Sequence, residues 1–188
     1  MIRVVKLGGS LLETAALPLC LAAAMRLPGL TVIVPGGGPF ADQVRTAQRR
    51  YRFGEVAAHR MALLAMQQMA ELMRGLLPEL EILSAADSLT AAAVSAKTLV
   101  WLPQIAELDA AGIPASWDIT SDSLAAWLAG RIAADALVVV KSAPITAGTA
   151  WPELQRQGIL DPAFARFANA ASFKITVVNK DDFLFRHD

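Results

Sequence analysis

The sequence has few of the side chains that bind metals or form cross-links. It contains one cysteine, Cys20, and two histidines, His59 and His187. A single cysteine excludes an internal disulfide bond and a metal site built from several cysteines, and it fits the reducing cytoplasm, where we expect this chain. Two histidines give little support to a Ser-His-Asp triad or a histidine-rich metal site. We therefore predict no metal-ligating residues.

Charged residues are also scarce. They make up 18% of the 188 residues, and the 17 basic side chains are balanced by 17 acidic ones. Without net charge the protein has no bulk attraction for nucleic acid or for a membrane surface, and we expect neither as a partner. The longest apolar run near the start, residues 15–25, is too short to span a bilayer and contains Pro18.

Apolar residues, by contrast, are abundant. They account for 55% of the chain, and the mean hydropathy is +0.44. A chain of this length is most simply one domain, spanning residues 1–188, and it can form a substantial core. Because extra apolar surface usually forms an interface between subunits, we expect a homo-oligomer.

The first ten residues have the layout of a phosphate-binding site. Residues 2–7 have the β-branched content of a strand. Lys6 lies near the end of this strand, and Ser10 can cap a following helix. Between them, Gly8 and Gly9 let the backbone turn sharply and approach a ligand. A helix N-terminus beside a lysine suits a polyphosphate, although an ordinary first strand and turn would use the same residues.

This strand–glycine–helix arrangement occurs a second time. Residues 30–34 are apolar and β-branched, the segment PGGGP follows at 35–39, and a helix is expected at 40–50. Two such units predict a parallel sheet whose loops meet at the carboxyl edge of the strands, where ligands bind. We therefore predict an α/β fold, a three-layer αβα sandwich with a mainly parallel central sheet.

The rest of the chain alternates between helices and strands. Further helices are expected at residues 11–26, where Pro18 bends the helix or marks its start, and at 55–77, 89–95 and 161–170. Further strands are expected at 79–83, 98–102, 136–140 and 174–178, with a turn or short helix at 104–112 and a loop at 147–151.

The expected helix 55–77 carries two apolar stripes, which predict burial on two sides. One side would face the core and the other a partner subunit or a substrate. His59 on the first stripe is either a buried structural histidine or a substrate ligand. The stripes are His59, Leu63, Met66, Ala70, Met73 and Leu77, and Met61, Ala65, Met69, Leu72 and Leu76.

A polar segment, residues 116–123, directly precedes a helix that we predict to be amphipathic. The apolar positions of this helix are Leu124, Trp127, Leu128 and Ile132. Asp122 thus lies at a helix start, where it can act as a cap. Lys141 follows a buried-type strand, much as Lys6 does.

Lys6, Asp122 and Lys141 together are the set that phosphoryl transfer requires. The lysines offset charge on the transferring group, and glycine loops supply backbone N–H donors. An aspartate between the lysines positions their ammonium groups, and it can also help to bind Mg²⁺. Taken singly, each residue has a structural explanation as a solvated charge or a helix cap. The chain lacks the G-x-x-x-x-G-K-[ST] loop of P-loop enzymes and a G-x-G-x-x-G after a strand.

Three motifs in this order resemble the amino acid kinase family, which includes acetylglutamate, aspartate and uridylate kinases. They are VKLGGS at residues 5–10, PGGG at 35–38 and TSDS at 120–123. Within the family, the chain looks most similar to small kinases of methanofuran-type cofactor biosynthesis, which convert an aminomethyl-furanmethanol phosphate to its diphosphate. The segments that carry this similarity are 116–123, 141–144, 40–45 and 58–61.

The resemblance implies an ATP-dependent kinase of this furan phosphate, with Mg²⁺ as cofactor, acting in methanofuran- or methylofuran-type C1 cofactor biosynthesis. It implies catalytic roles for Lys6, Asp122 and Lys141. For ATP it implies Lys6, Gly8, Gly9, Ser10, Lys141 and Ser142. For the phosphorylated acceptor it implies Gly36, Gly37, Gly38, Arg45, His59, Trp117, Asp118, Thr120 and Ser121. An arginine suits the acceptor's phosphate and a tryptophan suits a planar ring.

The chain departs from the family in one segment. Many relatives carry Asp-x-Asp-Gly after the strand that ends here at Lys141, whereas this chain has SAPIT at 142–146. Two alternatives remain open. One is a kinase with another small acceptor, either a nucleoside monophosphate or an amino-acid carboxylate. The other is a catalytically silent nucleotide-binding or scaffold subunit.

Overall fold

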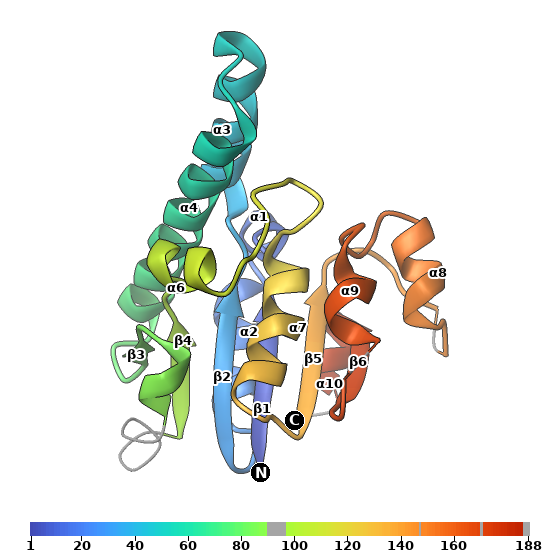
Figure 1. Cartoon of the computed structure of the whole chain (residues 1–188). Coiled ribbons are helices and arrows are strands. Elements are labelled where there is room, and N and C mark those ends of the chain that lie inside the picture. Colours follow the sequence, from blue (N-terminus) through green and yellow to red (C-terminus); the bar gives the residue numbers. More distant parts are fainter. Residues whose placement is uncertain (90–96, 147, 170, 186–188) are drawn as a thin grey trace.

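The computed structural model describes residues 1–89, 97–146, 148–169 and 171–185. Its centre is one sheet of six parallel strands in the order β3–β4–β2–β1–β5–β6 (Figure 1). Helices flank both faces, which confirms the predicted α/β sandwich. The strands are β1 (Ile2–Leu7), β2 (Leu30–Pro35), β3 (Glu81–Leu83), β4 (Thr98–Trp101), β5 (Ala136–Lys141) and β6 (Lys174–Asn179).

Each face of the sheet has its own apolar core. Helices α7 (Ser121–Arg131) and α9 (Phe164–Ala168) cover one face, and α2 (Leu17–Met25) and α10 (Lys180–Phe185) cover the other (Figure 1). Two further short helices are η1 (Ala86–Ser88) and α6 (Ile105–Ala110), the latter within the predicted turn or short helix at 104–112.

Helix α4 (Glu55–Leu76) is buried on two sides and contributes to both cores, but the two predicted stripes do not each face one core. Leu63 and Met66 pack in the core beneath α7, whereas Met69 and Met73 pack in the core beneath α2. Among the described residues, no helix is both long and apolar enough to cross a membrane.

The helix predicted at residues 11–26 is in fact two helices, α1 (Ser10–Glu13) and α2. The chain breaks at Ala15, which adopts a left-handed backbone with φ of 53°. Pro18 lies in the first turn of α2, where its missing N–H group costs no hydrogen bond. Of the two alternatives for Pro18, it marks the start of the helix.

Helix α7 is buried almost all round, so the prediction of an amphipathic helix was wrong. Apart from Trp127, every residue from position 121 to 129 is buried. The helix lies between the sheet and α9, and its small residues Ala125, Ala126 and Ala129 let these neighbours approach closely.

The C-terminal part also differs from the expectation. Helix α8 (Trp151–Arg156) begins at the end of the predicted loop, with Pro152 in its first turn. The helix predicted at 161–170 is shorter, because the Phe164 N–H donates to the Asp161 carbonyl in a turn before α9. Positions 90–96, 147, 170 and 186–188 lie outside the described residues, and with them most of the helix predicted at 89–95 and His187.

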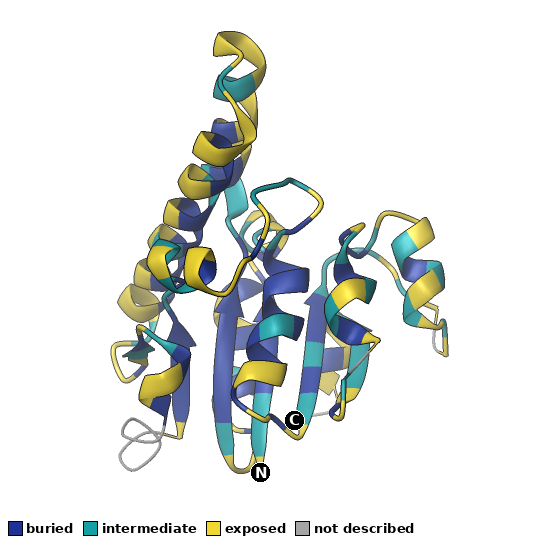
Figure 2. Ribbon diagram, in the orientation of Figure 1, coloured by how far each residue is buried: buried dark blue, intermediate teal, exposed yellow. Residues whose placement is uncertain are grey.

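Helices α3 (Gly38–Tyr51) and α4 form an antiparallel hairpin that projects beyond the carboxyl end of the sheet (Figure 1). The turn between them places Arg52 in the left-handed region, with φ of 55°. Figure 2 shows that the tip of the hairpin is exposed and that burial begins where the two helices approach the sheet. The base of the hairpin therefore forms one wall beside the strand ends.

The two predicted glycine loops lie in direct contact. Parallel pairing places Leu7 of β1 opposite Pro35 of β2, so the loops after both strands leave the sheet side by side. A Cβ on Gly9 would overlap the Gly38 backbone, and a Cβ on Gly36 would lie 2.5 Å from the Gly9 nitrogen. These glycines are needed for the close approach of the two loops to each other.

We predict that Gly9→Ala lowers the free energy of unfolding by about 2 kcal/mol or more, because the added methyl group forces the two loops apart. Gly75→Ala in α4 is the matched control, since a Cβ there meets no atom within 4 Å. This control should gain about 0.5–1 kcal/mol from helix propensity. Denaturant unfolding measures both changes, and equal effects would contradict the loop contact.

Candidate active site

The centre of the site is one carboxylate between two ammonium groups. Asp122 Oδ1 lies 2.7 Å from Lys6 Nζ, and Asp122 Oδ2 lies 2.5 Å from Lys141 Nζ. Lys6 is 5% exposed and Asp122 is 2% exposed. Buried charged groups are usually paired with a group of opposite charge, and Asp122 forms an ion pair with both lysines.

Strand alternation explains how these side chains meet. Val4 and Lys6 point to the same face of β1, and Val139 and Lys141 point to that same face of β5. Val4 and Val139 belong to the core beneath α7. The face that carries both lysines is therefore the face on which α7 packs, with Asp122 in the first turn of that helix.

The charges alter one another's ionisation. Burial raises the pKa of Asp122, but Lys6 and Lys141 outweigh it and lower that pKa below its usual range. Burial and the positive charge of Lys6 lower the pKa of Lys141, against the opposing effect of Asp122. Asp122 is thus a carboxylate at neutral pH, and both of its oxygens are taken by lysines. The expectation that Asp122 also helps to bind Mg²⁺ stays a prediction.

The lysines lie near the carboxyl ends of the neighbouring strands β1 and β5, where the topology predicts a crevice between the two strands. The chain leaves β1 toward α2 on one face and leaves β5 toward α9 on the other, which is the topology that opens a ligand site at the carboxyl edge of a parallel sheet. The Ser142 hydroxyl donates to the Ser10 hydroxyl across this crevice at 2.8 Å. Most of the residues predicted to bind ATP are therefore gathered here.

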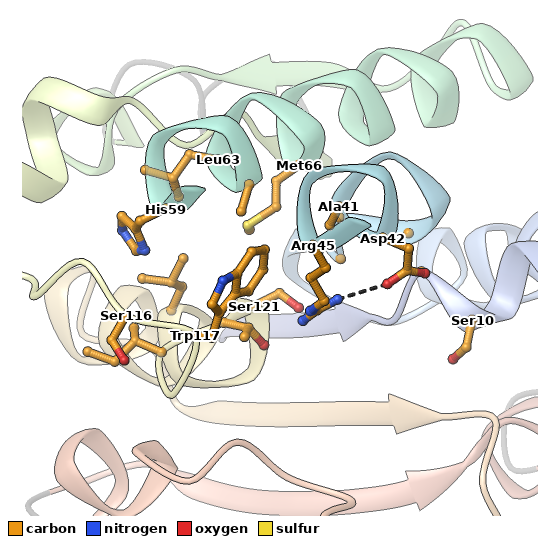
Figure 3. Close-up of a pocket in the computed structure, with 18 residues that line it drawn as sticks. Ser10, Ala41, Asp42, Arg45, His59, Leu63, Met66, Ser116, Trp117 and Ser121 are labelled. Atoms are coloured by element: carbon orange, nitrogen blue, oxygen red, sulfur yellow. Dashed lines mark hydrogen bonds and ion pairs between the residues drawn. The ribbon is translucent and has the colours of Figure 1, made fainter. Parts of the chain in front are cut away.

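A pocket of about 190 Å³ opens beside the crevice, between the α3–α4 hairpin and the start of α7 (Figure 3). Leu63 and Met66 of α4 form its apolar wall. The predicted site residues that line it are Gly9, Ser10, Gly36, Gly37, Gly38, Arg45, His59, Trp117, Thr120 and Ser121. The structure thus brings both glycine loops and most of the predicted acceptor residues to one cavity.

Arg45 and Trp117 form a stacked pair at the pocket. The Arg45 guanidinium carbon lies 4.3 Å from the centre of the Trp117 ring. Arg45 also pairs with Asp42 at 2.8 Å (Figure 3). The Trp117 indole N–H donates to Gln48 Oε1 at 2.6 Å, which fixes the orientation of the ring. The planar side chain and the cation are therefore positioned before any ligand binds.

His59 is buried, and its ring also lines the pocket (Figure 3), so its place is compatible with both alternatives considered for it. Burial lowers the pKa of His59, and hydrogen bonding with the Ser116 backbone opposes this only in part. The imidazole is therefore neutral at neutral pH. It can exchange hydrogen bonds with a ligand but adds no positive charge.

These features agree with the sequence comparison. Residues 1–145 match the model of the amino acid kinase family. The chain belongs to this family. No curated protein matches the sequence. Among the described residues, this family member has no cluster of three or more Cys, His, Asp or Glu side chains placed to bind a metal ion.

Solved structures of other kinases share the fold of this amino acid kinase family member. Uridylate kinase from Archaeoglobus fulgidus is 17% identical, with a TM-score of 0.74 over 98% of this chain and 94% of that one. UMP kinase from Bacillus anthracis is 16% identical, with a TM-score of 0.72 over 96% and 87%. Aspartate kinase from Synechocystis is 15% identical, with a TM-score of 0.70 over 96% of this chain and 38% of that one.

One predicted acceptor residue does not reach the pocket. Asp118 is exposed and is not among the residues that line the cavity. Its backbone N–H donates to the Ser116 hydroxyl, and its carbonyl accepts from Ala163 N–H. Asp118 therefore shapes the turn before α7 rather than presenting a carboxylate to a ligand.

Several residues of the site were not foreseen. Asp42 and Gln48 contact the stacked pair, and Asn179 donates to the Ser142 and Ala143 carbonyls at the end of β5. Asp161 accepts hydrogen bonds from Thr120 and Ser123 at the start of α7. Asp42 and Gln48 lie three residues before and after Arg45 on α3. This helical spacing could have indicated that they lie near Arg45. Asp161 and Asn179 come from distant segments and carry no local signal.

We predict that Asp122→Asn lowers the free energy of unfolding by about 3–5 kcal/mol near neutral pH, because two buried ammonium groups lose their charged partner. Because the Asp122 pKa is lowered in the folded chain, this stabilisation is present above about pH 4 and is lost as the pH falls through the folded pKa. Denaturant titrations at several pH values should show the difference from wild type shrinking in acid.

Asp118→Asn is the control for this measurement, since that carboxylate is exposed in the same segment. It should change stability by less than about 0.5 kcal/mol at every pH. A difference for Asp122→Asn that stays constant down to strong acid would contradict the charge pairing.

Proposed function

We propose that this protein is an ATP- and Mg²⁺-dependent kinase that transfers the γ-phosphoryl group to the phosphate of a small aminomethyl-furanmethanol phosphate. This places it in methanofuran- or methylofuran-type C1 cofactor biosynthesis. The observation that carries the kinase activity is the buried Asp122 carboxylate between Lys6 and Lys141, beside a pocket at the same strand edge. Membership of the amino acid kinase family supports it.

The donor side is the crevice between β1 and β5. Lys6 and Lys141 supply two positive charges for the phosphates of ATP, and Asp122 keeps them apart in fixed positions. Such preorganised charges stabilise the negative charge of the transferring group without reorganising during the reaction. Ser10 and Ser142 add hydroxyl groups at the same crevice.

The acceptor side is the pocket. Its volume of about 190 Å³ suits a small molecule, because pockets for drug-sized ligands are usually about 300–1,000 Å³. Trp117 offers a face for a planar ring, and Arg45 can exchange its contact with Asp42 for the acceptor's phosphate. An oxygen of that phosphate then attacks the γ-phosphorus, the bond from the γ-phosphorus to the bridging oxygen breaks, and ADP leaves.

Mg²⁺ enters this proposal together with ATP. Both Asp122 oxygens contact lysines, and the described residues provide no cluster of three ligands. Mg²⁺ in kinases is held largely by the substrate's phosphates, where it neutralises charge. The chain's own contribution is the pair of lysines on the other side of the phosphates.

We also propose that the protein is a homo-oligomer through α4. Part of its second apolar stripe stays at the surface, where Met61 and Leu76 are 39% and 44% exposed. Leu64, on the same helix, is 46% exposed. A second subunit over this face would remove the apolar area from water.

An acceptor panel tests the proposed activity. With purified protein, ATP and Mg²⁺, we predict ADP formation and a diphosphate product with the furan phosphate, and at least about tenfold lower kcat/KM with UMP, aspartate or acetylglutamate. Carboxylate acceptors would give an acyl phosphate that hydroxylamine traps. If UMP is the preferred acceptor in this panel, UMP takes the place of the furan phosphate in the proposal, an outcome consistent with the structural similarity to uridylate kinases. Nucleotide binding without any turnover would favour the silent subunit.

We predict that Lys6→Met lowers kcat by about 100- to 1,000-fold, because it removes one preorganised positive charge. The remaining Asp122–Lys141 pair is neutral, so the fold should be retained. Lys174→Met, at the exposed first position of β6, is the matched control and should keep wild-type kcat. Steady-state kinetics and thermal unfolding of both variants separate the effects, and full activity of Lys6→Met would rule out the mechanism.

A further inference from the structure

The Asp161 carboxylate caps helix α7 from a distant part of the chain. Asp161 Oδ2 accepts the backbone N–H groups of Thr120 at 3.0 Å and Ser123 at 2.9 Å. Asp161 Oδ1 accepts the Thr120 hydroxyl at 2.6 Å. Thr120 precedes the helix, yet its own side chain does not cap it. Asp161 therefore provides the cap that the side chain of a serine or threonine at the N-cap position usually provides.

The capped residues flank Asp122 on both sides. Thr120 and Ser123 enclose the first turn of α7, and the Asp122 carboxylate leaves this turn toward the two lysines. Fixing the backbone on either side of Asp122 fixes where its carboxylate can lie. A displacement of about 1 Å at such a group can cost a large part of the rate.

The segment that carries Asp161 is itself rigidly packed. The Ala163 N–H donates to the Asp118 carbonyl at 3.0 Å, and Phe164 is fully buried against α7. The Asp161 side chain is 9% exposed. This segment lies beyond residues 1–145, which match the family model, so the C-terminal part of the chain contributes directly to the geometry of the site.

Charge has opposing effects on a carboxylate at this position. Lys6 and Lys141 carry two positive charges, whereas Asp122 carries one negative charge. Asp161 supplies the second negative charge and is close enough to Lys141 to favour its charged form. Burial and Asp122 raise the pKa of Asp161, against the hydrogen bonds from Thr120 and Ser123. The carboxylate is thus placed at an electrostatic cost that its hydrogen bonds offset only in part.

We propose that Asp161 is a positioning residue of the phosphoryl-transfer site, which fixes the first turn of α7 so that Asp122 stays between Lys6 and Lys141. The role rests on the proposed kinase function, because it acts through Asp122. It requires the three accepted hydrogen bonds, and it does not require Asp161 to touch either substrate.

Two substitutions separate position from charge. Asp161→Ala removes all three hydrogen bonds. Asp161→Asn removes only the charge, because its amide oxygen can accept both backbone N–H groups while its amide N–H donates to the Thr120 hydroxyl, which can reverse its role. We predict that Asp161→Ala lowers kcat about 10- to 100-fold. We predict that Asp161→Asn keeps kcat within about threefold of wild type.

The KM for ATP distinguishes positioning from general damage. It should change less than about threefold in both variants, because Lys6 and Lys141 remain. Glu153→Gln, a half-buried position on α8 that does not line the pocket, is the control and should match wild type. Wild-type kcat in a folded Asp161→Ala variant would overturn the proposal, and so would an equal loss in Asp161→Asn. If Asp161→Ala does not fold, Asp161→Glu takes its place, since the longer side chain keeps the charge and misplaces its oxygens.

A crystal structure of Asp161→Ala gives a readout that needs no activity. We expect at least one of the two Asp122–lysine contacts, now 2.7 and 2.5 Å, to exceed 4 Å. Unchanged contacts would overturn the positioning role even if the wild type phosphorylates nothing in the acceptor panel. Absence of turnover by wild type would instead refute the proposed function, so the two failures are distinct.

Discussion

The Asp122 carboxylate makes it possible for Lys6 and Lys141 to lie together in a buried position. Two ammonium groups on neighbouring strands repel each other, and burial adds the cost of removing them from water. Asp122 meets both with one oxygen each. This arrangement needs β1 beside β5 and α7 across both, so the strand order of the sheet is the framework on which the proposed chemistry depends.

The two halves of the proposed site share the first turn of α7. Thr120 and Ser121 face the pocket, whereas Asp122 faces the lysines. Residues adjacent in sequence thus serve the acceptor side and the donor side. A short, buried and firmly capped turn can keep two binding regions in register, whereas two separate loops would have to be ordered independently.

Local sequence patterns predicted the elements that carry the site, and most of their ends agree with the structure to within two residues. Lys6 and Lys141 could be foreseen because each ends an apolar strand of a parallel sheet. The role of Asp161 could not, since its partners lie 38 and 41 residues away and no pattern around it marks a cap. The apolar spacing in α7 was misleading, because alanines on its other side are also buried.

The contact between the two glycine loops restricts how this site can change shape. Gly9 and Gly38 touch backbone to backbone, so neither loop can shift without displacing the other. The two glycine loops therefore form one mechanical unit. The α3–α4 hairpin starts at Gly38, but Arg45 and His59 lie farther along it on one wall of the pocket, so these positions can differ in sequence while the loop contact stays constant. Under the proposed function, acceptor preference can thus evolve separately from ATP chemistry.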